Sequence, residues 1–215
     1  MKHVVITGTS RGIGFEMVKL FSEAGHHVVA LSRKPESLQA LNLKNVQVIA
    51  CDITKEEELQ KIATHIEKIW NKVDVLINNA GAILNKSFAE STLEEFKAIY
   101  NTNVFGVVGL IQKLLPVMNA NSHVVNISSM GGVQGSMKFP GLSAYSSSKG
   151  ALITLTEMLA EEYKENGPSF NVLALGAVQT EMLEEAFPGY KAPLSASGMA
   201  EYIVGFSLNG QKYYN

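Results

Sequence analysis

Short runs of β-branched, apolar residues alternate with longer stretches of helical periodicity along most of the chain. Nearly continuous apolar runs of this length are typical of strands that are covered on both faces of a sheet. The pattern predicts six strands, over residues 3–7, 27–31, 46–50, 73–77, 123–127 and 170–174. It predicts helices over residues 13–24, 55–70, 93–118 and 144–166, and a final helix over about 197–208.

Regular strand–helix alternation predicts the fold class. It indicates an α/β fold with a doubly wound, Rossmann-type parallel sheet and helices on both faces. The Ser/Thr-x-x-Glu spacing of a capping box marks two helix starts, at Thr54 with Glu57 and at Thr92 with Glu95. Without an internal repeat or linker, residues 1–215 are expected to form a single dinucleotide-binding and catalytic domain, with a substrate loop at about 181–196.

Composition narrows the class of protein. Of the 215 residues, 46% are apolar and 18% are charged, with a net charge of -2, which argues against a nucleic-acid partner. No apolar stretch is long enough to span a membrane, and the amino terminus does not resemble a signal peptide. The single cysteine, Cys51, suits a reducing compartment, and the five histidines show no metal-ligand spacing. We therefore expect a cytoplasmic protein without membrane, nucleic-acid or metal partners.

A glycine-rich turn follows the first predicted strand, where residues 7–14 read Thr-Gly-Thr-Ser-Arg-Gly-Ile-Gly. Glycines at such a turn let the chain bend sharply, let the backbone approach a pyrophosphate and let the helix pack close to the strand. The freed N–H groups and the helix N-terminus can then hold phosphates. The spacing differs from the commoner Gly-x-Gly-x-x-Gly, and a plain tight connection is the alternative. Its place at the first strand–helix junction favours dinucleotide binding.

Tyr145 and Lys149 lie four residues apart at the start of a predicted helix, so they share one helix face. A free tyrosine has a pKa near about 10 and is a poor acid–base catalyst at neutral pH. A neighbouring ammonium favours the phenolate and lowers the tyrosine pKa toward the working range. Taken alone, the pair also fits a solvated lysine that packs its stem on a tyrosine.

Two more motifs stand at the ends of predicted strands, Asn-Asn-Ala-Gly over residues 78–81 and Asn-Ile-Ser-Ser over 126–129. They lie at the carboxyl edge of the sheet, where ligands bind in open α/β folds. With the glycine-rich turn, Asn-Val-x-Gly over 103–106 and Tyr-x-x-x-Lys over 145–149, they stand in an order that resembles the short-chain dehydrogenase/reductase family. The resemblance runs from Lys2 to about Thr180.

The resemblance implies a catalytic set of four residues. Tyr145 matches the acid–base that protonates the carbonyl oxygen, and Lys149 matches the residue that lowers its pKa and binds the nicotinamide ribose. Ser129 matches the hydroxyl that polarises the substrate carbonyl, and Asn103 matches the asparagine that holds a water in a proton relay. The cofactor-binding residues implied are Gly8, Ser10, Arg11, Gly12, Ile13, Gly14, Ser32, Arg33, Asp52, Ile53, Asn79, Ala80, Gly81, Tyr145, Lys149, Val178 and Thr180.

The end of the second predicted strand indicates the cofactor. A carboxylate there would bind the ribose hydroxyls of NAD and repel a 2′-phosphate, but the chain has Ser32 followed by Arg33 and Lys34. With Arg11 in the adjacent turn, these residues predict NADP(H). We expect an NADP(H)-dependent oxidoreductase acting on a small-molecule ketone or aldehyde and its alcohol. The alternatives are a 3-oxoacyl-thioester reductase and a non-catalytic NADP-sensing regulatory protein.

Four features extend or depart from this resemblance. Residues 104–115 and the helix that carries Tyr145 are apolar beyond one stripe, and in the family these two helices join subunits, so we expect a homodimer or homotetramer. Met182, Phe187 and Tyr190 are expected in either a substrate lid or a plain surface loop. The sequence has Leu-Gly at 175–176 where the family usually has Pro-Gly. Its last residues, 211–215, lack the family's final Val-Asp-Gly-Gly strand, as expected of either a short member or a chain without its tail.

Overall fold

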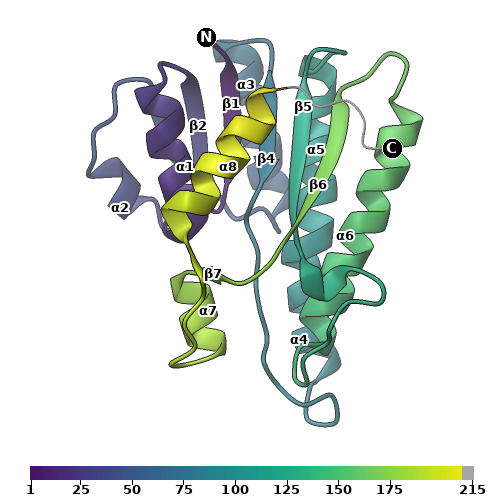
Figure 1. Cartoon of the computed structure of the whole chain (residues 1–215). Coiled ribbons are helices and arrows are strands. Elements are labelled where there is room, and N and C mark those ends of the chain that lie inside the picture. The colour runs from purple at the N-terminus through teal and green to yellow at the C-terminus, as the bar shows by residue number, and fades with distance from the viewer. Residues whose placement is uncertain (210–215) are drawn as a thin grey trace.

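Six parallel strands form a central sheet in the order β3-β2-β1-β4-β5-β6 (Figure 1). The structure, a computed structural model, describes residues 1–209, so the expectation for residues 211–215 lies outside the described residues. The six predicted strands are all present, with ends shifted by up to two residues. Their bounds are β1 His3–Thr7, β2 His27–Ser32, β3 Val46–Ala50, β4 Val75–Asn78, β5 His123–Ser129 and β6 Ser169–Leu175. The predicted Rossmann-type α/β fold is confirmed.

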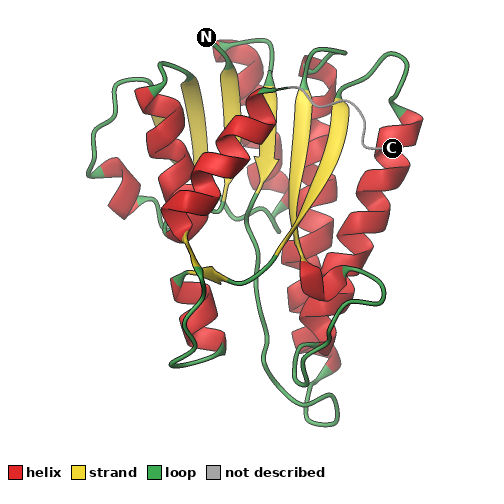
Figure 2. Cartoon of the chain, viewed as in Figure 1, coloured by secondary structure: helices red, strands yellow, loops and turns green. Residues whose placement is uncertain are grey.

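Helices connect the strands and cover both faces of the sheet (Figure 2). Their bounds are α1 Gly12–Glu23, α2 Glu36–Gln39, α3 Glu56–Ile69, α4 Leu93–Tyr100, α5 Gly106–Leu114, α6 Ser143–Glu162, α7 Glu181–Ala186 and α8 Ala196–Leu208. The segment predicted as a loop over 181–196 contains α7 and the short strand β8 (Leu194–Ser195), which pairs with β7 (Val178–Gln179). Neither α7 nor α2 was predicted, because both are too short to show a clear hydrophobic period.

The alternation of side chains along the strands divides the core into two layers. On β1, Val5 packs toward α3, α5 and α6, whereas Val4 and Ile6 pack toward α1 and α8. All three side chains are fully buried, which accounts for the apolar character of this strand on both faces. The strand order reverses between β1 and β4, and in open α/β sheets ligands bind at the carboxyl ends of strands beside such a reversal.

The predicted capping box at Thr54 and Glu57 is wrong. The hydroxyl and N–H of Thr54 both donate to Asp52 Oδ1, at 2.8 and 3.0 Å, and α3 begins after Lys55 without a side-chain cap. This local Asx-type turn competes with the cap for the same groups. The box at Thr92 and Glu95 is confirmed, with both reciprocal hydrogen bonds present.

The helix predicted over residues 93–118 is not one regular helix. A π-helical segment, Asn101–Phe105, separates α4 from α5, and a 3₁₀ turn, Leu115–Val117, follows α5. Gly106 lies so close to Ile53 that a Cβ atom would stand 2.9 Å from the Ile53 carbonyl oxygen. Widened turns of this kind occur often at functional sites. Here the turn directs Asn103 beneath the loop that follows β4.

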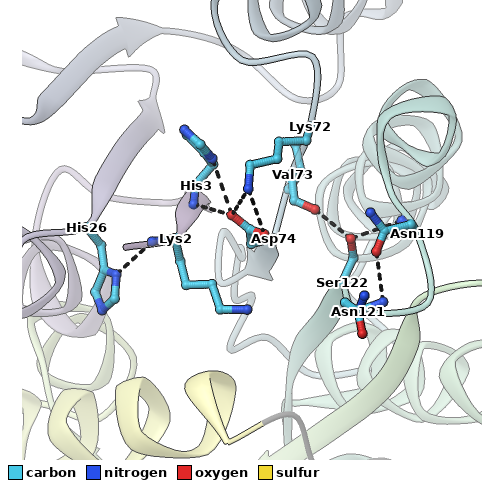
Figure 3. A network of polar contacts seen from close by, with 9 residues as sticks. All are labelled: Lys2, His3, His26, Lys72, Val73, Asp74, Asn119, Asn121 and Ser122. Atoms are coloured by element: carbon cyan, nitrogen blue, oxygen red, sulfur yellow. Dashed lines mark hydrogen bonds and ion pairs between the residues drawn. The ribbon is translucent and has the colours of Figure 1, made fainter.

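Polar side chains close the amino end of the sheet, opposite the carboxyl edge (Figure 3). Asp74 accepts a hydrogen bond of 2.7 Å from the backbone N–H of His3, and Ser122 donates one of 2.6 Å to the carbonyl of Val73. His26 Nδ1 accepts a bond of 3.0 Å from the backbone N–H of Lys2. These contacts satisfy backbone groups at strand starts, so this end of the sheet has a structural role.

Candidate active site

A cavity of about 910 Å³ opens at the carboxyl edge of the sheet. Both Gly14 and Asn103 are absent from its lining. Every other residue of the predicted cofactor and catalytic sets lines it: Gly8, Ser10, Arg11, Gly12, Ile13, Ser32, Arg33, Asp52, Ile53, Asn79, Ala80, Gly81, Ser129, Tyr145, Lys149, Val178 and Thr180. The fold therefore brings together residues from several strand ends and loops that lie far apart in the sequence.

Close packing explains the glycines of the turn after β1. Gly8 has a φ of 73°, and a Cβ there would stand 2.7 Å from the Ala80 Cα. Gly12 also has a positive φ, of 59°. A Cβ on Gly14 would overlap the carbonyl of Gly8, so this residue lets α1 pack against the turn and does not itself reach the cavity. Gly8 and Gly12 thus allow the turn, and Gly14 allows the close contact between the turn and α1.

Unsatisfied polar groups show that this region fits an anionic, hydroxyl-bearing ligand. Arg11 is the N-cap of α1 and its side chain makes no capping hydrogen bond, which leaves first-turn N–H groups available to a phosphate. Ser32 Oγ is the one buried side-chain polar atom without a hydrogen-bond partner among the described residues. Buried hydroxyls are normally bonded, so this atom is available to a ligand in the cavity.

Asn79 and Thr180 line the cavity, but their side chains form hydrogen bonds with backbone groups of the surrounding segments. Asn79 Nδ2 donates to the carbonyls of Thr7 and Gly8, at 3.1 and 3.0 Å, and fixes the glycine-rich turn against the end of β4. Thr180 Oγ1 accepts from the N–H of Leu183 at 3.3 Å and caps α7. In both cases the sequence pointed to a ligand contact, and the structure adds a positioning role.

Tyr145 and Ser129 form the polar centre of the cavity. Burial raises the pKa of the Tyr145 phenol, and a hydrogen bond with Ser129 lowers it by a smaller amount. Ser129 Oγ also accepts from the N–H of Gly131 at 3.2 Å, which fixes its position at the end of β5. The phenol is therefore protonated at neutral pH in the free protein and able to donate its proton.

The expected effect of Lys149 on the tyrosine pKa is not found in this structure. Lys149 Nζ donates to the carbonyl of Ile127 at 2.8 Å and lies 5.9 Å from the centre of the Tyr145 ring, beneath its face. The pKa of Tyr145 is raised by burial, and the pKa of Lys149 itself is lowered by burial to about 8. The ammonium donates to a backbone carbonyl of β5, and burial is the largest influence on the pKa of both groups.

Asn103 lies behind the cavity wall. Its Nδ2 donates to the Ala82 carbonyl and to Ser148 Oγ, both at 2.9 Å, and its Oδ1 accepts from the Ala82 N–H at 2.8 Å. The side chain is completely buried. Its amide thus holds the loop after β4 against α6.

Helix α7 contributes residues that the sequence did not identify as site residues. Glu181, Leu183 and Glu185 line the cavity, together with Met182 and Phe187, whereas Tyr190 does not. The Arg11 guanidinium donates to both carboxylate oxygens of Glu185, at 2.5 and 3.0 Å. Because 174 positions separate these two residues, no local pattern in the sequence could reveal their contact.

No cluster of three or more His, Cys, Asp or Glu side chains is arranged to hold a metal ion in the described part of the chain. None of the described helices combines the length and the apolar character that crossing a membrane requires.

Comparison with known proteins places this chain in a family. The sequence model of the short chain dehydrogenase family matches residues 2–191 of this chain. A farnesol dehydrogenase of Aedes aegypti is 31% identical over 221 residues, covering 95% of this chain and 90% of the relative. An uncharacterized oxidoreductase of Staphylococcus aureus (strain MW2) is 27% identical, covering 100% of this chain and 94% of the relative.

Solved structures agree with this assignment. ElxO with NADP bound matches with a TM-score of 0.86 at 29% identity, covering 100% of this chain and 95% of that chain. A short chain dehydrogenase/reductase of Saccharomyces cerevisiae matches with a TM-score of 0.86 at 25% identity, covering 98% of this chain and 92% of that chain. The family model, the sequence relatives and the shared fold lead to one conclusion: the chain belongs to the short chain dehydrogenase family of oxidoreductases.

Proposed function

We propose that this oxidoreductase uses NADP(H) to interconvert a ketone or aldehyde and the corresponding alcohol, with Tyr145 as the acid–base. The observation that carries the proposal is the buried, protonated Tyr145 phenol beside Ser129, in the same cavity as the glycine-rich turn. A proton donor, a hydroxyl partner and a phosphate cradle are the groups that carbonyl reduction with a nicotinamide needs from a protein.

Each site residue has its own role in the proposed reaction. When bound, a reduced nicotinamide supplies the hydride, which forms a C–H bond at the carbonyl carbon. The C=O electron pair moves to oxygen, and Tyr145 Oη gives that oxygen its proton. Ser129 donates a hydrogen bond to the same oxygen and orients it. Lys149, whose Nζ lies 5.9 Å from the centre of the Tyr145 ring, would bind the nicotinamide ribose.

The proposed preference for NADP(H) depends on the end of β2. Ser32 Oγ is buried without a partner among the described residues, and Arg33 and Lys34 follow it in the cavity lining. Hydroxyl and guanidinium groups match a 2′-phosphate, whereas a carboxylate there would repel it. The solved structure of ElxO with NADP bound, similar over the whole chain, supports the same cofactor.

The test is absorbance of NADPH in the presence of a panel of aldehydes and ketones, for the wild type and for Tyr145→Phe. We expect Tyr145→Phe to lose at least about 100-fold in turnover, because general acid catalysis contributes this much, while NADPH affinity changes little. Tyr163→Phe, which removes a hydroxyl at the other end of α6, should behave like the wild type. A Tyr145→Phe variant that keeps most of its activity would overturn the assignment. Tight NADPH binding without turnover of any carbonyl would instead favour a regulatory sensor.

A further inference from the structure

We propose that the substrate is an uncharged carbonyl compound with an extended apolar chain, or the matching alcohol. This inference rests on the proposed function and concerns the end of the cavity next to Tyr145 and Ser129. That end is lined by large apolar side chains from several segments of the chain: Ile83, Met130, Phe139, Leu142, Met182 and Phe187. Apolar walls around a few polar groups at the reacting centre are what an apolar ligand requires.

Hydrogen bonds and a ring contact join the segments that line the apolar end of the cavity. Asn85 Nδ2 donates to the Ala186 carbonyl at 2.8 Å, which joins the segment after β4 to α7. The Lys86 N–H donates to the Gly141 carbonyl at 2.9 Å, which joins the same segment to the loop before α6. Phe139 and Phe187, which both line the cavity, meet edge to face with ring centres 6.4 Å apart. A pocket held in this way is formed before the ligand arrives.

Among the residues that the structure describes, this end of the cavity has no free cation. Lys149 is the ammonium beside Tyr145 in the lining, and it is buried and bonded to Ile127. Lys86 is paired with Glu95 at 2.9 Å, and Lys138 donates to the carbonyl of Val133 at 2.6 Å; neither lines the cavity. A carboxylate or phosphate on the substrate would find no partner here in the described part of the chain.

Helix α7 adds to this selection because its two faces differ. Glu181 and Glu185 are four residues apart and share one face, which lies toward Gly12 and Arg11 at the glycine-rich turn. Met182 and Ala186 share the neighbouring face, beside the apolar wall. A substrate chain at this end of the cavity would therefore meet methionine and phenylalanine, while the carboxylates of α7 lie toward the glycine-rich turn.

The test compares butanal, octanal and 8-oxooctanoate as substrates with NADPH. Octanal has four more methylenes than butanal, and each one that is buried raises kcat/KM about fourfold. Burial of only two of them would already raise kcat/KM at least about tenfold. The terminal carboxylate should lower kcat/KM by about 100-fold, because it would be buried without a partner. Phe187→Lys should reverse the order of octanal and 8-oxooctanoate. The control Phe88→Ala, an exposed phenylalanine outside the lining, should keep the wild-type order.

Calorimetric titration separates this inference from the proposed function. Octan-1-ol and 8-hydroxyoctanoate are titrated into the protein with and without NADP⁺, so binding is measured without turnover. Tighter binding of octan-1-ol supports the inference even if no carbonyl is reduced, an outcome that would reject only the proposed function. Equal or tighter binding of 8-hydroxyoctanoate, or equal turnover of octanal and 8-oxooctanoate, would overturn the inference and leave the oxidoreductase assignment intact.

Discussion

Arg11 and Glu185 form a two-bond ion pair in the lining of the cavity, with N–O distances of 2.5 and 3.0 Å. The arginine comes from the glycine-rich turn, and the glutamate comes from α7. The hydrogen bond with Arg11 holds the pKa of Glu185 below its usual value, so the carboxylate is charged at neutral pH. The guanidinium fork is thus occupied by a carboxylate where we propose that a cofactor phosphate binds.

Glu185→Gln should therefore increase the affinity for NADPH. The substitution frees Arg11 for the 2′-phosphate, and because both side chains are exposed we expect only about a two- to fivefold lower Kd. The Kd for NADH, which has no 2′-phosphate, should change less. Fluorescence titration with both cofactors measures this. Glu184→Gln removes the same charge from the adjacent position of α7 and serves as the control. Equal effects of the two variants would contradict a specific competition.

The Arg11–Glu185 pair also marks the limit of what the sequence could predict. The strands, the glycine-rich turn and the position of Tyr145 were predictable, because each depends on local hydrophobic period or on a short motif. The pairing of Arg11 with Glu185 and the short helix α7 depend on contacts between distant parts of the chain. The direction of the Lys149 side chain was missed for the same reason: its partner, the Ile127 carbonyl, belongs to another element.

Lys149→Met should stabilise the protein while it removes activity. Burial lowers the pKa of Lys149 from 10.5 to about 8, which corresponds to about 3 kcal/mol against the charged form at neutral pH. The lost hydrogen bond to Ile127 offsets part of this, so we expect a net gain of about 1–2 kcal/mol in the free energy of unfolding at pH 7.

Urea denaturation at several pH values measures this effect. Because the folded-state pKa is lowered, the penalty is complete below about pH 8 and disappears as the pH rises toward 10.5. The advantage of Lys149→Met over the wild type should shrink over that range. Lys61→Met, on the exposed surface of α3, should change the stability by no more than about 0.5 kcal/mol. A Lys149→Met variant that is less stable than the wild type at pH 7 would contradict the assigned burial cost.

The amino end of the sheet should lose stability in mild acid. Burial, followed by the nearby N-terminus, lowers the pKa of His26, and its Nδ1 must be unprotonated to accept from the Lys2 N–H (Figure 3). Burial also lowers the pKa of His3. A group whose pKa is lowered by folding stabilises above its unfolded value, so Tm should fall as the pH drops below about 6.5. His26→Asn keeps an acceptor and should reduce that slope, whereas His65→Asn on α3 should not.

A dimer through α5 and α6 is still a prediction. The area of apolar surface available for it is smaller than the sequence suggested. The core between α5 and the sheet buries four of these apolar residues, Val107, Leu110, Ile111 and Leu114. Phe105 and Met158, in contrast, are 60% and 61% exposed. Exposed large apolar side chains at this position favour a symmetric interface between subunits. We expect Phe105→Glu with Met158→Glu to halve the mass found by light scattering at micromolar concentration. A wild type that is already monomer-sized would reject the dimer.

Cofactor choice should change when the end of β2 is altered. Ser32→Asp with Arg33→Ala places a carboxylate where Ser32 Oγ now lies buried and unpaired among the described residues, and removes the adjacent guanidinium. The carboxylate would repel a 2′-phosphate and accept hydrogen bonds from the ribose hydroxyls of NADH. Each lost charge-assisted bond is worth about 1.5–3 kcal/mol, so the ratio of kcat/KM for NADPH to that for NADH should fall by at least about tenfold. Lys44→Ala, an exposed lysine on the connection from α2 to β3, controls for the loss of positive charge alone. The assignment fails if the wild type prefers NADH, or if the double substitution leaves the ratio unchanged.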